Sequence, residues 1–134
     1  MADNAIPDDR SYTEEHEWVL ITPGAALPDA PVRVGITSVA AAALGDLVFV
    51  DLPEVGSTIV VGESCGEIES TKTVSELYPP VSGTVTAVNT AAVADPNVVA
   101  TDPYGTGWLF EVQPTAAGIL LTAAEYTDTN ERSA

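Results

Sequence analysis

Short segments rich in valine, isoleucine, threonine and aromatic residues recur along this chain, and glycines and prolines separate them. β-Branched and aromatic residues favour extended backbone, whereas glycine and proline favour turns. Several short strands divided by turn residues are typical of an all-β sandwich or barrel. We therefore predict a mainly β domain, with strands at residues 17–21, 32–36, 48–52, 58–61, 67–70, 74–77, 83–88 and 108–112.

Two or three short helices are expected between and after these strands. Thr37 or Ser38 can cap an alanine-rich segment that ends at Gly45. A side-chain oxygen at the N-cap satisfies a backbone N–H, and glycine accepts the left-handed conformation that often ends a helix. The Asp-Pro pair that begins the segment 95–99 predicts one further helical turn, because proline is favoured at the first helical position.

The C-terminal segment is predicted to form another helix. Residues 122–125 read Thr-Ala-Ala-Glu, which matches a capping box. In that motif the threonine and glutamate side chains each accept a hydrogen bond from the other residue's backbone N–H. We expect the tail over residues 127–134 to fray. The chain has no low-complexity linker, so its 134 residues predict a single domain over residues 1–134.

The charge balance and the apolar segments exclude several functions. Twenty acidic residues face four basic ones, which gives a formal net charge of −16. Nucleic acid and anionic membranes would be repelled by such a protein. The longest apolar stretch, residues 116–124, is far shorter than the ~20 residues of a spanning helix. The first ten residues lack the apolar core of a secretion signal, and Cys65 is the single cysteine. The simplest expectation is therefore a cytoplasmic protein, and a processed organelle protein would have the same features.

Lys72 is the only lysine of the chain, and it stands in the middle of a candidate hairpin. Gly62 lies ten residues before it and Gly83 eleven residues after it. Pro79 and Pro80 can end the outgoing strand, because proline has no N–H to donate to a β ladder. This near symmetry predicts that Lys72 occupies the hairpin turn.

The surroundings of Lys72 indicate attachment rather than catalysis. A protonated lysine is a poor nucleophile, and catalytic lysines need burial or a cationic neighbour. Lys72 instead has Glu67, Glu69 and Glu76 nearby, which would stabilise its charged form. An exposed lysine on a rigid turn suits acylation by another enzyme, after which the chemistry belongs to the attached group. We therefore predict that Lys72 is an attachment point and not a catalytic residue.

Six segments of the chain follow one another in the order of a known family. They are HEWV at 16–19, VGIT at 34–37, LGDLVFVDLPEVG at 44–56, ESTKTVSELY at 69–78, VSG at 81–83 and DPYGTGWL at 102–109. Over nearly its whole length the chain resembles the H-protein of the glycine cleavage system, a lipoate-bearing carrier. One segment alone would be weak evidence, whereas six in this order are highly specific.

The resemblance implies a fold and a cofactor site. The fold is the barrel-sandwich hybrid of lipoyl and biotinyl domains, a flattened β barrel. Lipoate would be joined to Lys72 through an amide. The family also has a cleft in which the aminomethyl-loaded arm rests, beside the HEW segment and just after the lysine. By that match Glu17, Ser75 and Glu76 are candidate cleft residues, and Glu17 and Glu76 could pair with the amine.

The resemblance also implies partners. A pyridoxal-phosphate glycine decarboxylase (P-protein) loads the arm, a tetrahydrofolate-dependent aminomethyltransferase (T-protein) unloads it, and a dihydrolipoyl dehydrogenase (L-protein) reoxidises it. A lipoate ligase or an octanoyltransferase would attach the acyl group. The carrier itself is expected to be a monomer that catalyses no step.

Other functions stay open at this point. The chain could be a lipoyl carrier or lipoate relay for another complex, such as a 2-oxo-acid dehydrogenase. A biotin carrier fits less well, because such carriers resemble one another in methionines beside the lysine, where this chain has Thr71 and Thr73. A small enzyme using Cys65 and His16, or a plain acidic scaffold, is the alternative of a different class.

No metal site is expected from the sequence. Glu14, Glu15 and Glu17 lie close together, but they lack the spacing of a calcium-binding loop. The single histidine and the single cysteine cannot form a His/Cys cluster.

Overall fold

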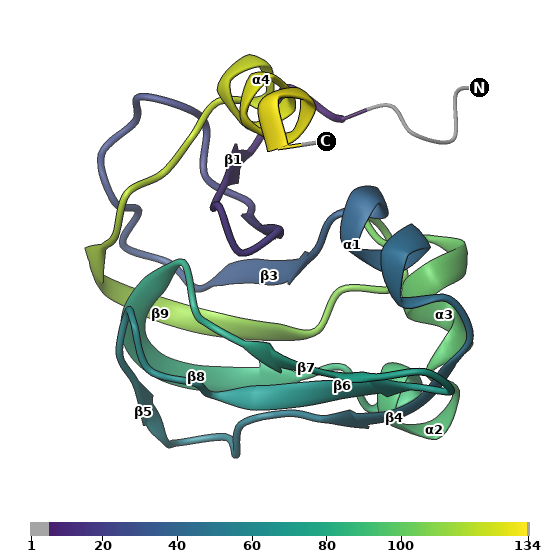
Figure 1. Cartoon of the computed structure of the whole chain (residues 1–134). Helices are drawn as coiled ribbons and strands as arrows, with labels where there is room; N and C mark the ends of the chain where they lie inside the picture. The colour runs from purple at the N-terminus through teal and green to yellow at the C-terminus, as the bar shows by residue number, and fades with distance from the viewer. Residues whose placement is uncertain (1–5, 134) are drawn as a thin grey trace.

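Two antiparallel sheets enclose the hydrophobic core (Figure 1). The computed structural model describes residues 6–133, with side chains to residue 129. The larger sheet has six strands in the order β1 (Ser11–Tyr12), β2 (Glu17–Val19), β3 (Val32–Ile36), β9 (Phe110–Ala117), β8 (Val81–Val88) and β5 (Thr58–Ile59). The smaller sheet has three strands in the order β4 (Leu47–Asp51), β6 (Gly66–Ser70) and β7 (Val74–Leu77).

The core lies between the sheets because side chains alternate along the strands. In β8, Val81 and Val85 are buried while Thr84 is exposed. In β6, Ile68 is buried between two exposed glutamates. These residues belong to one continuous cluster that draws on both sheets. Each buried aliphatic side chain contributes roughly 1.5–3 kcal/mol, so this shared core holds the two sheets together.

The predicted fold class, a barrel-sandwich hybrid, is confirmed, and the strand positions mostly agree with the prediction. The segments predicted at 32–36 and 74–77 match β3 and β7 residue for residue. The last strand differs, because β9 begins at Phe110 and extends to Ala117, where it pairs with β8. The two-residue strand β1 was not predicted, since two residues are too short to show an alternating pattern.

The first helix forms as its end residues predict. Helix α1 (Ser38–Leu44) begins after Thr37, whose side chain accepts a hydrogen bond from the N–H of Ala40. It ends at Gly45, which has a φ of 82° and donates its N–H to the carbonyl of Ala41. Both predicted caps are therefore confirmed, and they fix the two ends of α1.

Residues 6–133 contain four helices, one more than the two or three predicted. The helix that was missed is α2 (Thr90–Ala94), where the side chain of Asn89 accepts a hydrogen bond from the N–H of Ala91. Asparagine is a favoured N-cap, so the signal was present in the sequence. The turn predicted over 95–99 is α3 (Asn97–Thr101), which begins and ends two residues later.

The C-terminal helix α4 (Ala123–Ser133) begins with the predicted capping box. The N–H of Thr122 donates to Glu125 Oε1 at 2.9 Å, and the N–H of Glu125 donates to Thr122 Oγ1 at 3.1 Å. The structure continues α4 to Ser133 where fraying from residue 127 was expected, because these two bonds start a helix that then propagates. Residue 134 of that tail lies outside the described residues. Helix α4 lies beside β1 (Figure 1).

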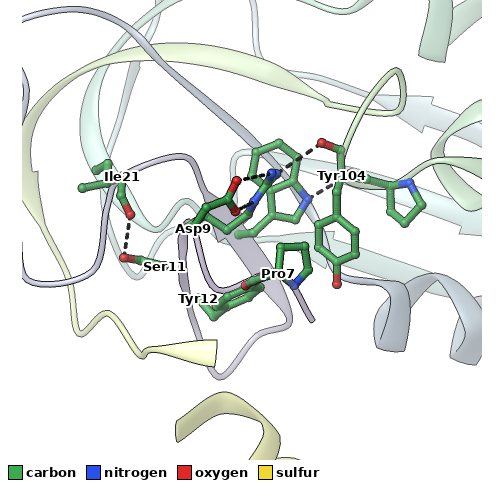
Figure 2. Close-up of polar contacts among 9 residues, drawn as sticks. Pro7, Asp9, Ser11, Tyr12, Ile21 and Tyr104 are labelled. Carbon is green, nitrogen blue, oxygen red and sulfur yellow. Dashed lines mark hydrogen bonds and ion pairs between the residues drawn. The ribbon is translucent and has the colours of Figure 1, made fainter. Parts of the chain in front are cut away.

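Arg10 fixes the N-terminal segment to the larger sheet. Its guanidinium lies over the rings of Trp18 and Tyr104, 4.7 and 5.4 Å from their centroids. It also forms an ion pair with Asp9 at 2.8 Å and donates to the carbonyl of Tyr104, contacts drawn in Figure 2. The hydroxyl of Ser11 donates to the carbonyl of Ile21, just after β2. These contacts hold the start of β1 against β2 and the residues that follow it.

Candidate functional site

The hairpin formed by β6 and β7 presents Lys72 at its turn. Glu69 pairs with Val74, and the N–H of Ser70 donates to the carbonyl of Thr73 at 2.8 Å. Thr71 and Lys72 are the two residues between these partners. The prediction that Lys72 occupies a hairpin turn is confirmed.

Hydrogen bonds hold the backbone of this turn. The buried Ser70 hydroxyl oxygen accepts from the N–H groups of Lys72 and Thr73, both at 3.1 Å. The N–H of Thr71 donates to the carbonyl of Asp46 at 3.0 Å, which ties the turn to the connection between α1 and β4. The backbone of Lys72 is therefore fixed by contacts that leave its side chain exposed.

The Lys72 side chain is available at the surface. The salt bridges among residues 6–129 are Arg10–Asp9 and Arg33–Glu111, so the Lys72 ammonium belongs to neither. Its side chain runs past Gly45, where an added Cβ would lie 3.4 Å from Lys72 Cε. The sequence predicted Gly45 as the end of a helix but did not predict this contact.

A pocket of about 130 Å³ lies between the β2 segment, α1 and the hairpin. Glu17, Ser75 and Glu76, the three candidate cleft residues, all line it. Lys72 is not among the lining residues, but α1 supplies one wall and ends at Gly45, against which the lysine side chain lies. From Lys72 to Glu76 a strand spans roughly 13 Å, at about 3.3 Å per residue.

Ser75 and Glu76 approach this pocket differently. Ser75 lies opposite the buried Ile68 in the ladder, so its side chain faces the same side as the core. Glu76 lies opposite the exposed Glu67 and therefore belongs to the outer face of the hairpin. Because β7 is an edge strand, Glu76 borders the pocket at its rim.

Glu17 is the buried acid of the pocket. Its side chain is 2% exposed, and Oε2 accepts the N–H of Tyr78 at 2.7 Å. Oε1 has no hydrogen-bond partner among the described residues. Burial raises the pKa of Glu17 to about 8, the charge of Glu15 adds to this rise, and the Tyr78 N–H opposes it. Glu17 therefore lines the pocket, and one of its carboxylate oxygens is buried without a hydrogen-bond partner among the described residues.

The raised pKa of Glu17 predicts a pH-dependent stability. An unfolded glutamate titrates near 4.5, whereas Glu17 in the fold titrates at about 8. Between these values the unfolded chain releases a proton that the native protein keeps, so the free energy of unfolding falls as the pH rises. At about 1.4 kcal/mol per pKa unit, this loss is on the order of a few kcal/mol. We therefore expect the free energy of unfolding, measured in urea, to fall less for Glu17→Gln than for the wild type between about pH 5 and about pH 8.5.

Glu76→Gln is the matched control for that comparison, because Glu76 is an exposed glutamate at the rim of the same pocket. It should follow the wild-type pH dependence. Equal pH profiles for wild type and Glu17→Gln would show that Glu17 is ionised in the native protein at neutral pH.

The contacts of Cys65 and His16 do not support an enzyme built on these two residues. Burial and the charge of Glu17 raise the pKa of the Cys65 thiol to about 12, so a thiolate is scarce at neutral pH. Nδ1 of His16 is hydrogen bonded to the hydroxyl of Tyr126 at 2.7 Å. Within the described residues, no group of three His, Cys, Asp or Glu side chains is arranged to hold a metal ion.

Tyr126, which connects α4 to this region, was not predicted from the sequence as a functional residue. Its ring is buried, and its hydroxyl contacts both His16 and Thr37. A signal was present, because a capping box is often accompanied by an apolar contact between the residue before the N-cap and the fourth helical residue. Here these are Leu121 and Tyr126, and both belong to the same apolar cluster.

No helix in the described part of the chain is long and apolar enough to cross a membrane.

The chain forms two sheets arranged as a barrel-sandwich hybrid, and its one lysine lies at a hairpin turn. These two features place it in the class of carrier domains. The family model described as Glycine cleavage H-protein matches residues 10–133, so the chain belongs to the glycine cleavage H-protein family. It is 57% identical to the glycine cleavage system H protein of Beutenbergia cavernae over 91% of this chain and 94% of that protein. It is 58% identical to the H protein of Mycobacterium avium over 88% of this chain and 86% of that protein.

A solved structure is similar throughout. The crystal structure of a glycine cleavage system H protein from Mycobacterium marinum superposes with a TM-score of 0.93 at 70% identity. The match covers 94% of this chain and 99% of that one. The arrangement of sheets described above is therefore that of a solved member of the family.

Proposed function

We propose that this chain is the lipoyl carrier protein of the glycine cleavage system and that lipoate is attached through an amide to Lys72. The observation that carries this proposal is a single lysine, exposed on a hydrogen-bonded hairpin turn, in a member of the H-protein family. The neighbouring pocket supports it, because it is lined by residues of the same hairpin and by Glu17, whose Oε1 has no partner among the described residues.

The residues of the chain would display and shelter the arm. When bound, lipoate supplies a dithiol–disulfide pair that carries the aminomethyl group of glycine. Ser70 and Asp46 hold the turn, so the attachment point stays fixed. Glu17, Ser75 and Glu76 surround the pocket where the loaded arm would rest. A cationic amine there would favour the ionised form of Glu17, whose Oε1 has no partner among the described residues.

The proposed partners are the three other proteins of the system and an acylating enzyme. They are the pyridoxal-phosphate glycine decarboxylase (P-protein), the aminomethyltransferase (T-protein), the dihydrolipoyl dehydrogenase (L-protein), and a lipoate ligase or octanoyltransferase. The carrier would act as a cytoplasmic monomer that is a substrate of each enzyme and catalyses no step. Glu67 and Glu76 lie directly opposite each other on the outer face of the hairpin, an arrangement of like charges that suits a cationic partner surface.

Intact mass spectrometry tests the proposal in two steps. Incubation with lipoate, ATP and a lipoate ligase should add one lipoyl group to the chain. Subsequent incubation with a P-protein and glycine should add one aminomethyl group. A chain that is lipoylated but not loaded from glycine, and that passes its lipoyl group to an apo domain of a 2-oxo-acid dehydrogenase, would instead be a lipoate relay.

A further inference from the structure

The C-terminal helix is connected to two of the three walls of the Glu17 pocket through one hydroxyl group. The oxygen of Tyr126 lies 2.7 Å from His16 Nδ1 and 2.7 Å from Thr37 Oγ1. Tyr126 is 1% exposed and does not line the pocket itself. His16, which lines the pocket, and Thr37, which caps the helix that forms a second wall, therefore both contact one side chain of α4.

The first wall is the segment that carries His16 and Glu17. His16 lines the pocket and immediately precedes the buried glutamate. It has a φ of 68° and is the only non-glycine residue with a positive φ in the described part of the chain. That conformation costs roughly 1–2 kcal/mol for a residue with a Cβ, so surrounding contacts must hold it. The Tyr126 hydroxyl bond and an edge-on ring contact at 5.7 Å are two of them.

The second wall is helix α1. Thr37 caps this helix by accepting the N–H of Ala40, and Ala40 and Leu44 line the pocket. The N–H of Thr37 also donates to the carbonyl of His16 at 3.0 Å. The start of α1 and the His16 segment are therefore bonded to each other and, through Thr37 Oγ1 and His16 Nδ1, to Tyr126.

Tyr126 is itself firmly placed. Its ring stacks on Tyr12 with centroids 5.2 Å apart, and the capping box starts α4 just before it. The backbones of Tyr12 and Leu121 exchange hydrogen bonds of 2.9 and 2.7 Å, which fasten the segment before α4 to β1. Because both aromatic rings are buried, the hydroxyl position is set by the fold rather than by solvent.

We infer that Tyr126 is a positioning residue for the acyl arm: its hydroxyl fixes the His16 imidazole against the start of α1, and so the shape of the pocket that receives an arm attached to Lys72. This inference rests on the proposed function. It assigns to α4, which lies outside the pocket, control over how well the arm docks.

The test compares the stabilisation that an attached acyl chain gives to each variant. Octanoate attached to Lys72 serves as the probe, because its eight-carbon chain has no redox chemistry. A docked arm stabilises the native state as a tethered ligand does, so the wild-type unfolding temperature should rise on octanoylation. In Tyr126→Phe, which keeps the buried ring, this rise should fall by roughly half or more, because the pocket walls lose their common partner.

Tyr12→Phe is the matched control. It removes a hydroxyl from the other ring of the same stacked pair, and that hydroxyl donates to the carbonyl of Pro7 rather than to a pocket wall. It should lower the stability of both forms and keep the full rise on octanoylation. His16→Asn is a second variant, since asparagine accepts the left-handed backbone but is too short to replace the imidazole contact. It should lose the rise as Tyr126→Phe does.

The outcomes separate the two proposals. If Lys72 accepts no acyl group, the proposed function fails. If octanoylation proceeds but leaves the wild-type unfolding temperature unchanged, the arm does not dock and the inference is overturned. It is also overturned if Tyr126→Phe lowers both forms equally and keeps the full rise, because that pattern indicates a purely structural tyrosine.

Discussion

Lys72→Arg should abolish addition of a lipoyl group while leaving the fold unchanged. Lys72 is the only lysine of the chain, so the variant contains no ε-amine to acylate. Arginine keeps the positive charge at the turn, but its guanidinium stays protonated and does not react as an amine nucleophile. The turn is held by backbone N–H groups and the Ser70 hydroxyl, which the substitution does not remove. Intact mass after ligase treatment should show one lipoyl group on the wild type and none on the variant.

A second variant tests whether position matters as well as chemistry. Arg33 is half-exposed, on strand β3 of the larger sheet, and its side chain pairs with Glu111. The double variant Lys72→Arg, Arg33→Lys therefore moves the only lysine from the hairpin turn to a sheet surface. It should stay unmodified. Lipoylation at position 33 would show that the acylating enzyme does not need the hairpin geometry. It would remove the main support for Lys72 as the specific attachment point.

The largest loss of stability is expected for Gly83→Ala. Gly83 lies in β8, where its backbone approaches β9 very closely. A Cβ at this position would overlap the carbonyl oxygen of Gln113 and lie 2.9 Å from its carbonyl carbon. That carbonyl belongs to β9, which lies between β8 and β3, so it cannot move away from the added Cβ without disrupting the ladder. We expect the free energy of unfolding to drop by about 1–3 kcal/mol or more, measured by urea denaturation.

Gly24→Ala is the control for this substitution. Gly24 has a φ of 82°, and no atom lies within 4 Å of an added Cβ. Its free energy of unfolding should drop only by the cost of a left-handed alanine, roughly 1–2 kcal/mol, and by less than that of Gly83→Ala. Equal losses of unfolding free energy at the two positions would mean that the β8–β9 ladder adjusts readily to an added Cβ and that the close approach at Gly83 is unimportant.

The features that could be predicted from the sequence are those encoded locally. The two glycines around Lys72 and the prolines after it define a hairpin, and β6 and β7 form it with the lysine at the turn. Thr37 and Gly45 define the ends of α1 for the same reason, since each cap acts on backbone groups a few residues away.

The features that escaped prediction depend on residues distant in sequence. Glu17 stands in an acidic segment and gives no sign of burial, yet all three residues of β2 are buried between β1 and β3. The pocket combines the β2 segment, α1 and the hairpin, and Tyr126 reaches its walls from a residue 110 positions after His16. Such contacts are set by tertiary packing, which local patterns do not encode. The resemblance named Glu17, Ser75 and Glu76, but not how they are held.

The bond from Thr71 to Asp46 has a consequence for how such a carrier would work. Since the loop bearing Lys72 is anchored to the body, rotation about side-chain bonds is the motion left to search for a partner's active site. Rotamer changes of exposed side chains take picoseconds to nanoseconds, whereas rearrangements of whole domains take microseconds or longer. Delivery of cargo would therefore be limited by encounter and release between proteins, and every partner would meet the same unchanging surface.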